Sequence, residues 1–142
     1  MAVEKRASAV WKGNLVDGKG TVTAASGAFG DLAVTWRMRS EQGLEATSPE
    51  ELIAAAHAAC FSMALSHGLS QAGNPPDELR VEATVGFQAG EGITGIRLNA
   101  TGRVPGIDAA AFEEAVGEAA RGCPVSKALA GVEITHSAAL EA

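Results

Sequence analysis

Hydrophobic and polar positions near the N-terminus alternate in three short runs separated by glycine and aspartate. Such alternation predicts half-buried β-strands. In the third run, residues 32–40, four apolar side chains would face one side of the strand, with Arg37 and Arg39 on the other. The two arginines are therefore expected to share a strand face. The runs are ASAVWKG, GTVTAA and LAVTWRMRS.

From Ser48 to about Gln71 the spacing of apolar residues changes to that of a helix. The serine provides a hydroxyl N-cap, a proline occupies the first helical position, and Glu51 stands where its carboxylate can bond back to the cap. Glu50 has no capping role, so its carboxylate is available for other contacts. The segment GNPPDE ends the helix because it contains glycine and a proline pair.

The second half of the chain predicts a hairpin, a helix, a short helix and a closing strand. Asp108 is the expected N-cap of the longer helix, with Phe112 and Val116 on its inner face. Pro124 opens the short helix. The order of elements predicts an α+β fold of antiparallel β-sheets packed with two main helices. The segments, in order, are LRVEATVGFQ with ITGIRLNATGRV, DAAAFEEAVGEAARG, CPVSKALAG and VEITHSAAL.

Composition favours one folded domain over residues 1–142, since the chain is 46% hydrophobic. The net charge of −6 is spread along the sequence without a basic cluster, which argues against a nucleic-acid partner. The start contains no apolar leader segment, and His57 and Ser62 interrupt the longest apolar stretch, which we expect to fall short of a membrane span. We therefore expect a cytoplasmic protein without membrane association, and no cofactor.

Residues 54–60, AAAHAAC, place small side chains on every face of the predicted helix. A core helix ordinarily fills space with larger residues, so another helix, a partner subunit or a ligand should approach this backbone. His57, Cys60 and His67 fall within roughly 80° on a helical wheel. Three interpretations remain open here: a packed core thiol, a Cys/His nucleophile pair, or a metal site, which lacks a carboxylate on that stripe.

A reactive Cys60 would require a cation, because an ordinary thiol is mostly protonated at neutral pH. Arg37 and Arg39 are the cations offered just upstream, and Glu50 can offset the cost of burying one of them. Cys123 differs, since it precedes Pro124 at a helix start, where the helix dipole favours a thiolate. On that ground alone Cys123 would be the better nucleophile.

Two segments, SPEELIAAAHAACFSMALS and PGIDAAAFEEAVGEAARGCPVSKAL, closely resemble the osmotically inducible protein C / organic hydroperoxide resistance (OsmC/Ohr) family, and more its OsmC branch. The likeness extends to the N-terminal strands. The resemblance implies a thiol-dependent peroxidase that reduces organic hydroperoxides to alcohols. It also implies an intertwined homodimer with two active sites at the subunit interface.

The same resemblance implies a role for each site residue. Cys60 matches the peroxidatic cysteine and Cys123 the resolving one, so that a sulfenic acid on Cys60 would be converted into a disulfide. Glu50 matches the carboxylate that holds a catalytic arginine, for which Arg39 is the first choice and Arg37 the second. The implied reductant is a small dithiol such as a lipoyl group.

Helix geometry adds a prediction about the dimer. Glu50 precedes Cys60 by ten residues, which is about 15 Å along a straight helix and too far for one site. We therefore expect Glu50 and Arg39 to serve the Cys60 of the other subunit. Two other functions stay open: a Cys/His thiol hydrolase or acyl transferase using His57, and a non-catalytic redox sensor or binding module.

Overall fold

The structure is a computed structural model that describes residues 2–41, 43 and 45–141. Its contacts divide the chain into two compact units, residues 1–52 and residues 53–142. We call them the N-terminal and C-terminal units and describe each by itself. The expected single domain over residues 1–142 stays a prediction, and its two end residues lie outside the described part.

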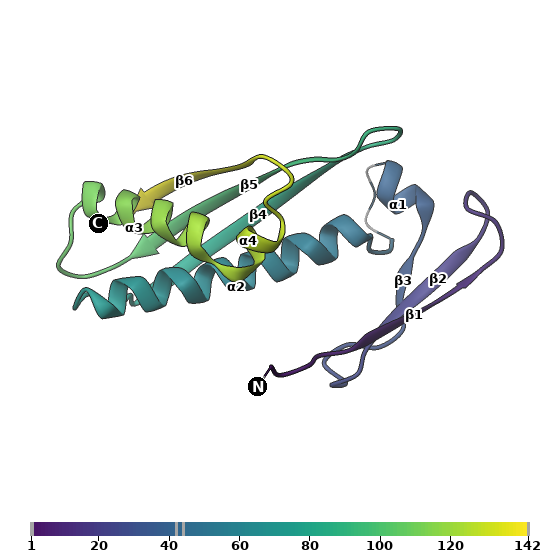
Figure 1. The fold of residues 1–142 in the computed structure, drawn as a ribbon, viewed down its shortest axis with the longest axis horizontal. Helices are drawn as coiled ribbons and strands as arrows, with labels where there is room; N and C mark the ends of the chain where they lie inside the picture. The colour runs from purple at the N-terminus through teal and green to yellow at the C-terminus, as the bar shows by residue number, and fades with distance from the viewer. Residues whose placement is uncertain (1, 42, 44, 142) are drawn as a thin grey trace. The chain divides into compact units, whose positions relative to one another are not determined.

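The N-terminal unit contains a three-stranded antiparallel sheet in the order β1-β2-β3 (Figure 1). This meander follows the three alternating runs of the sequence, although β1 is exposed along its whole length. A short helix α1 follows β3, and the unit also holds the first turn of α2. The bounds are β1 Ala7–Lys12, β2 Lys19–Ala24, β3 Leu32–Val34, α1 Trp36–Ser40 and α2 Pro49–Gln71.

The expected third strand was wrong beyond Val34, because Trp36–Ser40 is a helix. The Thr35 hydroxyl accepts a hydrogen bond from the Met38 backbone N–H at 3.1 Å and so caps the helix start. This local bond offers the backbone an alternative to the sheet ladder. Arg37 and Arg39 consequently do not share a strand face: two positions apart on a helix, they point about 200° from each other.

The C-terminal unit contains the second sheet, in the order β4-β5-β6, with α3 and α4 between β5 and β6 in the chain. The expected hairpin is confirmed as the antiparallel pair β4 and β5. The α+β fold class is confirmed, and only the strand direction of β6, which pairs with β5 in parallel, differs from the expected antiparallel sheets. The chain returns through α3 and α4, and such a crossover makes parallel pairing possible. The bounds are β4 Glu78–Gln88, β5 Gly92–Arg103, α3 Ala109–Gly122, α4 Pro124–Ala128 and β6 Ile134–Leu140.

One face of the second sheet carries the core of this unit. Ile96, Leu98 and Ala100 of β5 are buried at alternating positions, while the intervening Arg97 and Asn99 are exposed. Helices α2 and α3 supply the other large core side chains and lie along the sheet in Figure 1. The expected inner residues of α3 are confirmed as buried. The core side chains from the two helices are Phe61, Leu65, Leu69, Phe112 and Val116.

The expected helix from Ser48 to about Gln71 is confirmed as α2, but the expectation that its apolar stretch falls short of a membrane span was wrong by length and composition. Its 23 residues are enough to cross a membrane by length and composition alone. A core helix passes the same test, and α2 places Phe61, Leu65 and Leu69 in the core of the C-terminal unit. Much of the rest of its surface, including Met63, is exposed.

Candidate active site

The start of α2 separates the roles of two adjacent glutamates. Ser48 caps the helix, since its hydroxyl accepts from the Glu51 backbone N–H at 3.1 Å. The Glu51 side chain is exposed and accepts a hydrogen bond from the Thr47 hydroxyl at 2.6 Å. Glu50 is buried. The helix start thus turns the Glu50 carboxylate into the protein and leaves Glu51 at the surface.

Glu50 forms an ion pair with Arg39. The Arg39 Nε–H group donates to both carboxylate oxygens, at 3.2 Å to Oε1 and 3.0 Å to Oε2. The Glu50 side chain is 6% exposed and that of Arg39 is 36% exposed, so a buried carboxylate orients a half-buried guanidinium. Arg37 pairs instead with Glu41 and Glu45 at the surface. Between the two arginines, the geometry favours Arg39.

A cavity of about 330 Å³ adjoins Arg39 within the N-terminal unit. Its walls combine two indole rings with aliphatic side chains, and Arg39 supplies the charged group. Such an apolar cavity with one charged group suits a ligand that has a hydrocarbon part and a polar end. The lining residues are Trp11, Leu15, Val34, Thr35, Trp36, Arg39 and Pro49.

The C-terminal unit brings the two cysteines together. Cys60 on α2 is half-buried, Cys123 between α3 and α4 is fully buried, and both are free thiols. They are close enough for a hydrogen bond between their side chains. Residues distant in the sequence thus form a thiol pair that can convert to a disulfide.

The pKa of Cys60 is raised from its ordinary value of 9.0. Burial is the largest cause, and a backbone hydrogen bond with Val125 opposes it. The hydrogen bond to Cys123 and the charge of that thiol raise the pKa further. This direction is opposite to the lowered pKa expected from a neighbouring guanidinium. Arg39 and Glu50 belong to the N-terminal unit, whereas Cys60 lies in the C-terminal unit.

Cys123 is held by the first turn of α4. It is the N-cap of that helix, and its sulfur accepts from the Ser126 backbone N–H at 3.3 Å. The Ser126 hydroxyl lies 3.1 Å from the same sulfur and 2.7 Å from Nε2 of His57. The sequence analysis did not predict a role for Ser126. Its position three residues after a cysteine that caps a helix could have indicated this contact.

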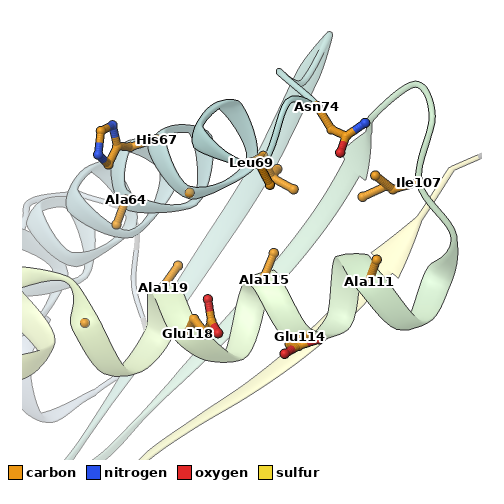
Figure 2. A pocket seen from close by; sticks show the side chains of 13 residues that line it. Ala64, His67, Leu69, Asn74, Ile107, Ala111, Glu114, Ala115, Glu118 and Ala119 are labelled. Carbon is orange, nitrogen blue, oxygen red and sulfur yellow. The ribbon is translucent and has the colours of Figure 1, made fainter.

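The histidines of α2 therefore do not pair with Cys60 as the helical wheel suggested. His57 is fully buried and bonds through Ser126 toward Cys123, and burial lowers its pKa. His67 is exposed and lines a cavity of about 480 Å³ between the end of α2 and α3, which excludes both cysteines (Figure 2). Within residues 2–41, 43 and 45–141, no group of three potential metal ligands comes together.

Comparisons with known proteins identify the family of this chain. Residues 40–137 match the family model of the OsmC-like protein. The chain is 45% identical to "Peroxiredoxin OsmC" of Escherichia coli K12 over 91% of this chain and 92% of that one. It is 36% identical to the Bacillus subtilis "Organic hydroperoxide resistance protein OhrA" over 74% and 76% of the two chains.

A solved structure extends the likeness to three dimensions. The Legionella pneumophila structure described as an organic hydroperoxide resistance protein OsmC superposes with a TM-score of 0.72 at 26% identity, over 98% of this chain and 99% of that one. The part of the chain that matches the family model, residues 40–137, includes both cysteine segments, the hairpin between them and the helix that carries Cys60. The chain belongs to the OsmC-like protein family.

Proposed function

We propose that this protein is a thiol peroxidase that reduces organic hydroperoxides to alcohols, with Cys60 as the peroxidatic and Cys123 as the resolving cysteine. The observation that carries the proposal is the contact between the two free thiols. The names of its relatives, a peroxiredoxin and organic hydroperoxide resistance proteins, support the same activity.

The reaction follows from the chemistry of these groups. The Cys60 thiolate attacks the outer peroxide oxygen, the O–O bond breaks, and the alkoxide leaves and takes up a proton. Cys60 becomes a sulfenic acid. Cys123 attacks that sulfur, a disulfide forms and water is released, which protects Cys60 from further oxidation. A dithiol then reduces the disulfide by thiol–disulfide exchange.

Arg39 is the residue that stabilises charge in this mechanism. A guanidinium favours both the starting thiolate and the negative charge that develops on the departing oxygen. Glu50 keeps the guanidinium oriented through its two contacts with Nε. The apolar cavity beside Arg39 accommodates the hydrocarbon part of the substrate, which supports an alkyl hydroperoxide over hydrogen peroxide.

The active site is completed between two copies of the chain. Glu50 and Cys60 lie ten residues apart on one helix, about 15 Å along its axis. We assign Arg39 and Glu50 of one subunit to Cys60 of the other. The exposed apolar side chains of β1 and of the loop that follows it, among them Val10, Trp11, Leu15 and Val16, favour burial against a second copy.

Two parts of the proposal concern the cell. The reductant is a small dithiol such as a lipoyl group, which reaches a half-buried disulfide more readily than a protein partner does. The location is the cytoplasm, where the compartment keeps thiols reduced. Rates with dihydrolipoamide and with thioredoxin, and fractionation of cells that produce the protein, test these two points.

The decisive experiment measures consumption of an alkyl hydroperoxide with dihydrolipoamide as reductant. We expect Cys60→Ser to be inactive, and Cys123→Ser to complete one turnover and then stop as sulfenic or over-oxidised Cys60. Near-normal turnover by Cys60→Ser would show that the nucleophile is assigned wrongly. A redox sensor would oxidise once without turnover even as wild type, and a thiol hydrolase would cleave thioesters without consuming peroxide.

A further inference from the structure

A buried chain of hydrogen bonds leads away from the thiol pair. Cys60 contacts Cys123, the Cys123 sulfur lies 3.1 Å from the Ser126 hydroxyl, and that hydroxyl lies 2.7 Å from Nε2 of His57. His57 and Cys123 are fully buried and Ser126 is 5% exposed. The peroxide-reduction step described above uses neither Ser126 nor His57.

The resolving step needs a base at this position. Cys123 must lose its proton to attack the sulfenic acid, because the thiolate and not the thiol is the nucleophile. Its sulfur is shielded from solvent, so bulk water is a poor acceptor for that proton. Among the described residues, the titratable groups that contact Cys123 directly or through Ser126 are the Cys60 thiol on α2 and the His57 ring, also on α2. The Cys60 thiol has already reacted at that stage, which leaves His57.

The His57 ring is suited to accept a proton rather than only to fill space. Burial lowers its pKa, so the ring is neutral at physiological pH and Nε2 can act as an acceptor. The other ring nitrogen, Nδ1, is buried, and the described residues supply it with no hydrogen-bond partner. An apolar side chain would fill the same space without that cost, which points to a role in the reaction.

We propose that Ser126 and His57 form a proton relay that serves Cys123 during disulfide formation. The inference rests on the proposed peroxidase function. Ser126 contacts the reacting sulfur, and His57 is a positioning residue that acts through Ser126.

The Cys123 thiol gives its proton to the Ser126 oxygen while the hydroxyl proton moves to Nε2 of His57. The Cys123 sulfur bonds to the Cys60 sulfur, the S–O bond of the sulfenic acid breaks, and hydroxide leaves. The formal oxidation state of the Cys123 sulfur rises by one and that of the Cys60 sulfur falls by one, so no further reagent is required. The proton released by Cys123 balances the one that hydroxide takes up to become water.

The experiment separates the two chemical steps in one turnover of the full-length protein. One equivalent of tert-butyl hydroperoxide is added, samples are quenched with dimedone, and mass spectrometry follows Cys60 sulfenic acid and the disulfide with time. We expect Ser126→Ala and His57→Gln to form sulfenic acid within about twofold of the wild-type rate. Disulfide formation should slow by at least about tenfold at pH 6.5.

The pH profile distinguishes a relay from a structural role. The wild-type rate of disulfide formation should change little between about pH 7 and 8, because neutral His57 is fully available. In both variants it should rise about tenfold per pH unit, because hydroxide must then remove the proton in place of His57. Ser126→Thr should restore the hydroxyl and with it the flat profile. Controls are Ser62→Ala, whose hydroxyl bonds to the Ala59 carbonyl, and exposed His67→Gln.

A second measurement keeps the relay testable apart from peroxide chemistry. Ellman's reagent converts Cys60 into a mixed disulfide and releases one equivalent of the coloured thiolate. Attack by Cys123 on the Cys60 sulfur releases the second equivalent, and the rate of this second phase reports the relay. If peroxide fails to oxidise wild-type Cys60 while release still depends on Ser126 and His57, the proposed function is wrong and the relay stands. If peroxide oxidises Cys60 but both variants match wild type in rate and pH profile, the relay is wrong.

Discussion

At the scale of single residues, chemistry here depends on which way a side chain is turned. Glu50 and Glu51 are adjacent and chemically identical, yet one is buried against Arg39 and the other lies at the surface beside Thr47. Arg37 and Arg39 show the same division, because only Arg39 meets Glu50. In each pair, the less exposed member is the one assigned to the mechanism.

Replacement of Glu50 by glutamine should lower kcat/KM for an alkyl hydroperoxide by about tenfold to a hundredfold. The variant loses the charge that orients Arg39, and a small misplacement of a catalytic group is sufficient for such an effect. Glu51→Gln is the matched control and should keep near-wild-type kinetics. Equal losses in the two variants would contradict the special role of Glu50.

The stability of the reduced protein should fall as the pH drops below about 6.5, in part because of His57. Burial lowers the pKa of His57 in the folded state, so the unfolded chain binds a proton first as the pH falls. Between pH 6.5, the ordinary pKa of the ring in the unfolded chain, and the lower folded-state pKa, this extra proton on the unfolded chain favours unfolding. Denaturant unfolding at a series of pH values should show a flatter acid limb for His57→Gln than for His67→Gln.

At the scale of elements, the long periodic segments were predictable and the short ones were not. The α2 helix, the hairpin of β4 and β5, and α3 with its Asp108 cap all follow the sequence pattern. Helix α1 was missed because a single capping bond from Thr35 overrode an alternating pattern of only a few residues. The parallel pairing of β6 was missed because strand direction depends on how the crossover packs, which no local pattern encodes.

Packing between α3 and β5 leaves no room for a side chain at Gly102. A Cβ atom there would lie 2.6 Å from the Phe112 ring and 3.1 Å from Leu79. Gly102→Ala should therefore destabilise the protein by about 1–3 kcal/mol, as overpacked cores do. The control is Gly122→Ala in α3, where a Cβ meets nothing within 4 Å. Urea denaturation of both variants measures the difference, and an unchanged Gly102→Ala would contradict this packing.

At the scale of the whole molecule, the groups assigned to catalysis lie in two units. The thiol pair belongs to the C-terminal unit, and Arg39 with Glu50 belongs to the N-terminal unit. The proposed dimer unites them by placing the arginine of one chain beside the thiol of the other. Two predictions test this assembly.

Co-expression of Cys60→Ser and Arg39→Ala chains should restore activity that neither variant has alone. A mixed dimer contains one complete site, in which Cys60 of one chain meets Arg39 of the other. Random pairing of equal amounts makes about half of the dimers mixed, so activity should approach about a quarter of wild type. Sites built within one chain would give no recovery above the two separate variants.

The pKa of Cys60 should differ between the wild-type dimer and Arg39→Ala. Burial raises the pKa of Cys60 in the single chain. A guanidinium at about 4 Å would stabilise the thiolate by about 4 kcal/mol at an effective dielectric of about 20, which lowers the pKa. We expect the pKa of Cys60 to lie below its ordinary value of 9.0 in the wild-type dimer and above that value in the variant. Thiolate absorbance during a pH titration in a Cys123→Ser background measures both, and an alkaline value in wild type would contradict the arginine assignment.

The sequence by itself determined the regular elements and the chemical types at the candidate site, because periodicity, capping and cysteine context are local properties. The resemblance to the OsmC/Ohr family singled out Cys60, Cys123 and Glu50, with Arg39 as the first of two choices for the arginine. Only the tertiary structure decided which of these side chains meet. It paired Arg39 rather than Arg37 with Glu50, and it turned His57 toward Ser126 rather than Cys60. Contacts between distant residues depend on how helices cross and which face is buried, and no local pattern contains that information.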